Sequence, residues 1–104
     1  MNMMRTVIVP VDGEAYVTEI PNTLENMQEL VGGYIQTARL TLGIDIVCNE
    51  EGHIMGLPEN RNFPAIVGTF FLIRNDTMDG KMHGLSDRVA RNWREAINNG
   101  VLRR

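Results

Sequence analysis

Several features that define whole classes of protein are scarce or missing in this sequence. Cysteine occurs once, at Cys48, so no disulfide bond can form within the chain, which agrees with a reducing compartment. The longest strongly apolar run, residues 65–73, is much shorter than the roughly 20 residues of a membrane-spanning helix. Residues 1–5 lack the apolar segment of a secretory signal. We therefore expect a soluble, cytoplasmic protein that has no membrane partner.

Positive charge is also limited. Lysine and arginine together number 10 against 13 aspartates and glutamates, which gives a formal net charge of −3. Affinity for duplex nucleic acid comes largely from several basic side chains that neutralise phosphates, so duplex nucleic acid is not an expected partner. A small anionic ligand needs only one or two well-placed cations and a few backbone N–H groups, and an acidic protein can supply both.

The residues that usually carry catalysis or bind metals do not cluster in the sequence. His53 and His83 each stand alone, without a second ligand at metal-binding spacing, so we predict neither a metal site nor a cofactor. Cys48 lies in an apolar segment and is interpreted as a core residue instead of a nucleophile. The adjacent Glu50 and Glu51 are typical of a solvated turn. We predict a binding protein, not an enzyme.

Length and patterning predict one domain, residues 1–104, with a frayed tail at 101–104. Asp12-Gly13 favours a tight turn between strands at 5–10 and 15–20. A helix is expected after an Asn22 cap, with Glu25 completing a capping box and the Gly32-Gly33 pair ending the helix.

The second half of the chain alternates between apolar runs and turn residues. Gly52 is expected in the left-handed conformation, and Gly68 in an apolar run indicates either a bulge or close approach of a ligand or neighbouring chain. The remaining predicted elements are strands at 34–40, 44–49, 53–55 and 65–73, loops at 56–64 and 75–84, and a helix from Ser86 to Gly100. This order, ββαββββα, predicts an α+β fold with a mostly antiparallel sheet of about five or six strands and its two helices on one face.

The loop Gly56-Leu-Pro-Glu-Asn-Arg61 is the most promising candidate binding segment. Its proline stiffens the chain, and Asn60 and Arg61 place an amide beside a guanidinium, a combination suited to phosphate or to a base edge. The alternative is structural: Asn60 closes the turn by bonding its own backbone, and Arg61 is exposed or paired with Glu59 or Glu50.

Four segments together resemble the family named domain of unknown function 3846, which is common in phages and mobile elements. They are residues 20–35, Cys48-Asn-Glu-Glu-Gly52, Gly56-Leu-Pro-Glu-Asn-Arg61 and Val67-Gly-Thr-Phe-Phe71, and the resemblance covers about residues 5–97. It implies a phage or mobile-element accessory protein, and it favours a functional Asn60-Arg61 pair because the family pattern includes Leu-Pro-x-Asn-Arg. The chain departs from the family in its short segment at 61–64, so no lid is expected there.

By analogy with small phage proteins that lack catalytic groups, the resemblance suggests an anti-defence sponge. Such a protein sequesters a nucleotide-derived signalling molecule, often as a homo-oligomer with shared pockets. The predicted ligand-binding residues are Asn60, Arg61, Asn49, Tyr34 and Thr69, with Tyr34 stacking on a base. The alternative is a protein–protein interaction module or an inhibitor of a host defence protein.

Overall fold

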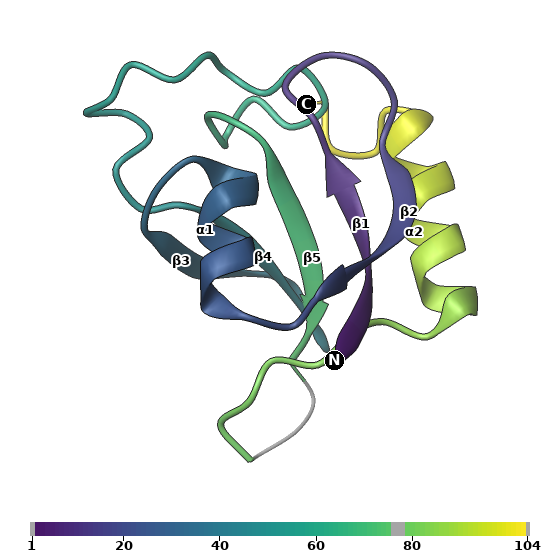
Figure 1. Cartoon of the computed structure of the whole chain (residues 1–104). Coiled ribbons are helices and arrows are strands. Elements are labelled where there is room, and N and C mark those ends of the chain that lie inside the picture. Colours follow the sequence, from purple (N-terminus) through teal and green to yellow (C-terminus); the bar gives the residue numbers. More distant parts are fainter. Residues whose placement is uncertain (1, 76–78, 104) are drawn as a thin grey trace.

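The computed structural model describes residues 2–75 and 79–103. The chain forms five strands and two helices within these ranges (Figure 1). They are β1 (Met3–Val9), β2 (Tyr16–Pro21), α1 (Leu24–Val31), β3 (Ile35–Thr41), β4 (Ile44–Asn49), β5 (Phe70–Arg74) and α2 (Asp87–Asn98). The α+β class is confirmed. Among the described residues, no helix is long and apolar enough to cross a membrane.

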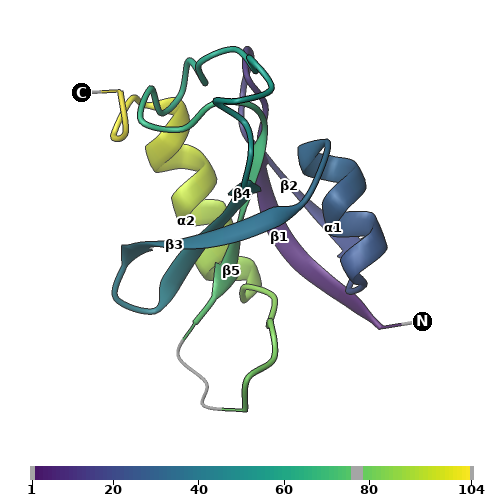
Figure 2. The same cartoon turned by 90° about the vertical axis from the view of Figure 1, so that its left-hand side faces the viewer.

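The strands form one antiparallel sheet, as predicted. Their order in the sheet is β2-β1-β5-β4-β3. Two hairpins, β1–β2 and β3–β4, are joined in the middle of the sheet by β5, which is the last strand in the sequence. The strands β2 and β3 are left at the two edges. Figure 2 shows β3 on the side nearest the viewer.

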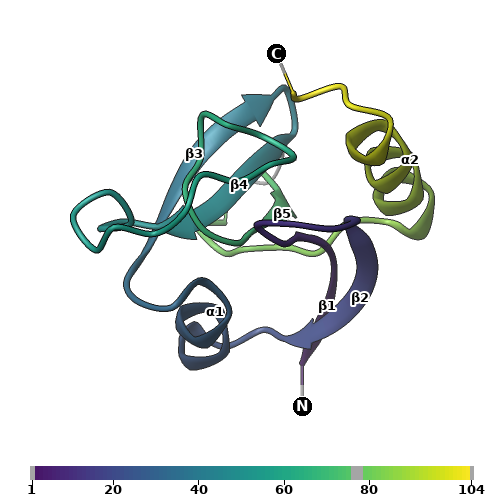
Figure 3. The same cartoon turned by 90° about the horizontal axis from the view of Figure 1, so that it is seen from above.

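The two helices cover opposite faces of the sheet, so the prediction that both lie on one face was wrong (Figures 2 and 3). The reason lies in the central strands, which are apolar at consecutive positions. In β5, Phe70 and Leu72 pack on the α2 side, whereas Phe71 and Ile73 pack on the α1 side. Each face therefore has its own core and needs its own cover.

The start of α1 differs from the prediction by one residue. The N-cap is Thr23, whose hydroxyl accepts a hydrogen bond from the Asn26 N–H at 3.2 Å. Asn22 instead donates its side-chain amide to the Met82 carbonyl oxygen at 3.2 Å, which ties the helix start to the chain before α2. The predicted glycine ending is confirmed, because Gly32 is the C-cap with φ of 80°.

The segment between β4 and β5 contains fewer strand residues than predicted. Residues 53–55 form turns instead of a strand, and β5 begins at Phe70 instead of residue 65. Gly68, with φ of 80° and packed against Leu57, turns the chain just before β5. Gly52 is not left-handed as predicted: its hydrogen atom makes room for Val67, since an added Cβ would lie 2.6 Å from the valine Cγ2.

The chain between β5 and α2 also packs into the sheet. The Leu85 N–H donates to the Arg5 carbonyl oxygen at 2.8 Å, and Arg74 forms a bridge with His83. The predicted loop at 75–84 includes residues 76–78, which lie outside the described residues. Ser86 caps α2 as predicted, accepting a hydrogen bond from the Val89 N–H at 3.2 Å.

Candidate ligand-binding site

Asn60 lies inside the protein, not on its surface. Its side chain is 0% exposed, and all of its polar atoms are bonded to backbone. The amide donates to the carbonyl oxygens of Val9 at 3.1 Å and Gly68 at 3.0 Å, while its oxygen accepts from the N–H groups of Asn62 at 2.8 Å and Phe63 at 3.3 Å. Asn60 therefore shapes the loop, as in the structural alternative, and has no polar atom directed at solvent.

Asn62, which was not among the residues predicted from the sequence, forms a second set of internal hydrogen bonds. Its side-chain amide donates to the carbonyl oxygens of Gly13 at 2.9 Å and Pro10 at 3.3 Å, and the side chain is almost completely buried. The Arg61 N–H donates to the Val11 carbonyl oxygen at 2.8 Å. These bonds fix the loop against the β1–β2 connection. The sequence signal for this arrangement was the pair Asn60 and Asn62, because asparagine side chains at such spacing can each bond nearby backbone.

The Arg61 side chain points outward and is 77% exposed. Its guanidinium lies 3.9 Å from a carboxylate oxygen of Asp12, so its partner is neither Glu59 nor Glu50, the two considered from the sequence. An ion pair this exposed contributes little to stability, at most about 1 kcal/mol. The guanidinium is therefore open to a stronger acceptor.

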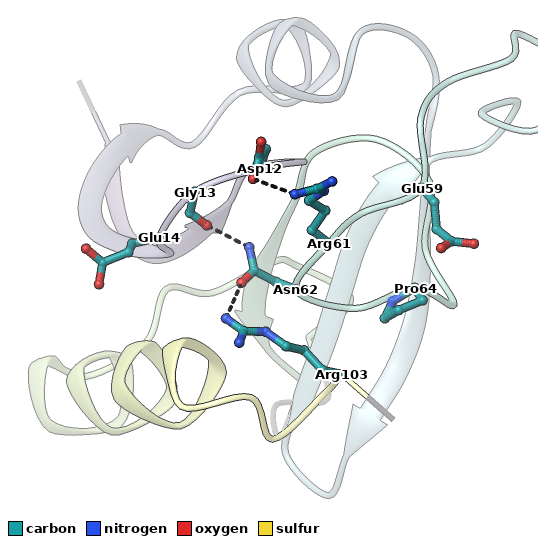
Figure 4. Close-up of a pocket in the computed structure, with 8 residues that line it drawn as sticks. All are labelled: Asp12, Gly13, Glu14, Glu59, Arg61, Asn62, Pro64 and Arg103. Carbon is teal, nitrogen blue, oxygen red and sulfur yellow. Dashed lines mark hydrogen bonds and ion pairs between the residues drawn. The ribbon is translucent and has the colours of Figure 1, made fainter.

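A second guanidinium approaches the same place from the C-terminus. Arg103 lies with its Nη2 3.5 Å from the side-chain oxygen of Asn62 (Figure 4). The same nitrogen lies 3.5 Å from the carbonyl oxygen of Asn98. Its N–H donates to the Gly100 carbonyl oxygen at 3.1 Å, so residues 101–103, which we expected to be frayed, form a turn. Residue 104 lies outside the described residues.

Arg61 and Arg103 both line an open hollow of about 620 Å³ (Figure 4). Three carboxylates, those of Asp12, Glu14 and Glu59, line it as well. The hollow thus combines cationic donors with carboxylate acceptors. Such a surface suits a ligand that carries both an anionic group and hydrogen-bond donors.

The other predicted ligand residues lie away from this hollow. Asn49 is buried, donates its amide to the Val31 carbonyl oxygen at 3.0 Å and accepts from the Glu51 N–H at 2.7 Å, so it holds the turn after β4. Tyr34 is 65% exposed beside that turn, and Thr69 is half-buried just before β5. Of the five predicted residues, only Arg61 lines the hollow.

Cys48 is a titratable residue of the described chain whose pKa is shifted. It is a buried core residue, as predicted, and lies on the α2 side of the sheet. Burial raises the pKa of its thiol, against the smaller opposing effect of a contact with the Gln36 amide at 3.7 Å. In the parts of the chain that the structure describes, no three histidine, cysteine, aspartate or glutamate residues gather closely enough to hold a metal ion.

Comparison with known proteins gives one match. A family model described as "Domain of unknown function (DUF3846)" matches residues 4–98, which confirms the family resemblance found in the sequence. No curated protein and no solved structure matches the chain.

Proposed function

We propose that this chain, which belongs to the DUF3846 family, binds a nucleotide-derived signalling molecule and sequesters it without changing it chemically. The observation that carries the proposal is the meeting of Arg61 and Arg103, far apart in the sequence, at one hollow (Figure 4). Sequestration needs only tight binding. In the setting that the family suggests, a phage or mobile element would use such a protein in the host cytoplasm against a nucleotide-based defence.

The loop geometry supports capture of a phosphate by Arg61. Because Asn60 and Asn62 hold the loop backbone through buried hydrogen bonds, little backbone freedom is lost when the guanidinium takes a ligand. A guanidinium can donate two parallel hydrogen bonds to a phosphate. Arg103 on the same hollow provides a second contact of the same kind.

The carboxylates fit the other half of a nucleotide. The amino and ring N–H groups of a purine base are donors, and the carboxylates of Glu14 and Glu59 at the rim are acceptors. They also repel a bare polyanion, so the hollow favours a molecule with both parts.

Self-association belongs to the same proposal. The hollow is open on its outer side, and a chain of this size encloses a ligand most easily when a second copy supplies a wall. Tyr34 is exposed and does not line the hollow of its own chain. In this proposal, Tyr34 of a neighbouring copy stacks on the base.

Native mass spectrometry of freshly purified protein tests the proposal directly. We expect a homo-oligomer that retains a small molecule, and we expect denaturation to release a nucleotide unchanged in mass. Calorimetry with a panel of linear and cyclic nucleotides provides the affinity. Binding weaker than high micromolar for every member would refute the proposal. Turnover of a bound nucleotide would contradict the part of the proposal that excludes catalysis.

A protein-interaction module is the second candidate, and a separate surface favours it. Ile54, which is 86% exposed, and Met55, which is 51% exposed, lie in the turn after β4. Exposed apolar side chains gathered at a turn are typical of contacts with another protein. Pull-down from a bacterial lysate with the native chain and with Ile54→Glu tests it: a stoichiometric partner lost only in the variant supports the module.

A further inference from the structure

A second hollow, of about 460 Å³, lies between the β3–β4 turn and the first half of α2. Figures 2 and 3 show this turn on the side of the sheet that α2 covers. It shares no lining residue with the hollow at Arg61 and Arg103. The family match and the proposed function leave it without a role.

The walls of this hollow are mainly apolar. Ile44 and Leu85 are buried at its base, and Val89 and Trp93 form one side from successive turns of α2. Leu42 forms the opposite rim and is 90% exposed. The half-buried indole of Trp93 therefore offers part of its surface to an aromatic ring.

The charge of this hollow differs from that of the first one. Among its lining residues in the described chain, Arg74 is the one charged side chain, and none is a carboxylate. The first hollow has two arginines and three acids. Among the described residues, the lining of the hollow beside Trp93 is thus mainly apolar with one cationic side chain, whereas the lining of the other is polar and of mixed charge.

We propose that the hollow beside Trp93 binds an aromatic molecule that carries one anionic group, with its ring against Trp93 and its anion on Arg74. The backbone of Arg74 is held at this place by its N–H, which donates to the His83 carbonyl oxygen at 2.9 Å. A guanidinium has five N–H donors, so it accommodates a ligand oxygen beside another acceptor.

Ser86 adds a second polar contact at the same place. Its hydroxyl oxygen accepts the Val89 N–H at 3.2 Å to cap α2, which leaves the hydroxyl proton to donate to an anionic ligand. The hollow therefore combines one cation, one hydroxyl donor and an aromatic wall. This combination recognises a nucleobase with a phosphate, or an aromatic carboxylate or sulfonate, through the same contacts.

The single tryptophan of the chain makes binding directly observable. The probes are 8-anilinonaphthalene-1-sulfonate and N-phenyl-1-naphthylamine, which share the ring system and differ in the sulfonate. We expect saturable energy transfer from Trp93 to one equivalent of the sulfonate, with the neutral dye binding about tenfold more weakly because it lacks the charge. Equal affinities, or a bound sulfonate that receives no energy from Trp93, would overturn the proposal.

Two exposed apolar residues supply matched variants. Leu42→Glu places a negative charge at the rim, and Ile54→Glu places one on an exposed turn outside the hollow. Neither side chain is in the core, so both variants should fold, which circular dichroism checks. We expect about tenfold weaker sulfonate binding for Leu42→Glu and a change within about twofold for Ile54→Glu. Equal effects of the two variants would contradict the assignment.

Arg74→Gln and a competition experiment complete the test. Arg74→Gln should remove the preference for the sulfonate over the neutral dye, and Arg61→Ala should leave it unchanged, which separates this site from the proposed function. Displacement of the dye by adenosine monophosphate but not adenosine would assign the site to nucleotides. Displacement by 2-naphthoate alone would assign it to aromatic acids, and retention of the preference in Arg74→Gln would refute the site.

Discussion

The backbone N–H of Asn62 donates to the side-chain oxygen of Asn60 at 2.8 Å, and both side chains are almost completely buried. The Asn60 side chain bonds to β1 and to the turn before β5. The Asn62 side chain bonds to the β1–β2 connection. The exposed Arg61 between them is therefore positioned by its two neighbours, not by contacts of its own side chain.

Replacement of Asn60 should be costly for stability. Asn60→Ala removes four hydrogen bonds between a buried side chain and the backbone. The Phe63 N–H keeps its bond to the Asn60 carbonyl oxygen at 3.2 Å, but the other three groups lose a buried partner, so we expect a loss of about 3 to 5 kcal/mol in the free energy of unfolding. Urea unfolding measures it. Asn92→Ala, at an exposed position of α2, is the control and should change stability by less than about 0.5 kcal/mol.

Replacement of Arg61 should separate binding from stability. Its side chain is mostly exposed and its ion pair with Asp12 is long, so Arg61→Ala should change the free energy of unfolding by less than about 1 kcal/mol. Calorimetry with the nucleotide that binds the native chain should show weaker binding for the variant. A variant that unfolds, or one that binds with native affinity, contradicts the assigned role of Arg61.

Local sequence signals predicted the hairpins, both helices and the antiparallel class, because turn residues and helix caps act within a few positions of where they stand. Gly32 ends α1 and Ser86 begins α2 as expected for this reason. The face covered by each helix was beyond those signals. It depends on β5 lying in the middle of the sheet, a contact between distant segments.

The candidate site shows the same division. Arg61 was predicted as a ligand residue and lies at the hollow. Arg103 lines the same hollow because the fold brings distant parts of the chain together, which no local sequence pattern indicates. Asparagine bonds equally well to a ligand or to the backbone, so the residue type of Asn60 does not distinguish the two uses. Its burial does, and burial is set by how residues 59–68 fold back on β1.

Two apolar side chains of α2 differ in burial, and they should differ in their contribution to stability. The indole of Trp93 is half-buried and packs against the core from its edge. Ile97 is completely buried in the core on the same helix. We expect Ile97→Ala to cost about 3 to 4 kcal/mol and Trp93→Ala about 2 kcal/mol. Thermal or urea unfolding of both variants checks the order, and a larger loss for Trp93→Ala would contradict it.

Cys48 provides a test of the core through pH. Burial among the side chains of the α2 face disfavours the thiolate and raises the pKa of the thiol above its ordinary value. In the unfolded chain the thiol ionises from roughly pH 8.5, whereas in the folded chain it stays protonated to a higher pH. Above the unfolded pKa, the folded state therefore holds more protons than the unfolded state.

That difference in bound protons gives the stability of the native chain a negative slope with pH. Between the unfolded and the folded pKa of Cys48, this residue should lower the free energy of unfolding by at most about 1.4 kcal/mol for each pH unit. Cys48→Ala loses packing at every pH but lacks this slope. The stability advantage of the native chain over the variant should thus shrink from pH 7 to pH 10 in urea unfolding, since the other titrating groups are common to both. An advantage that stays constant would show that the thiol ionises equally in the folded and unfolded chains, and that its burial does not hold the proton.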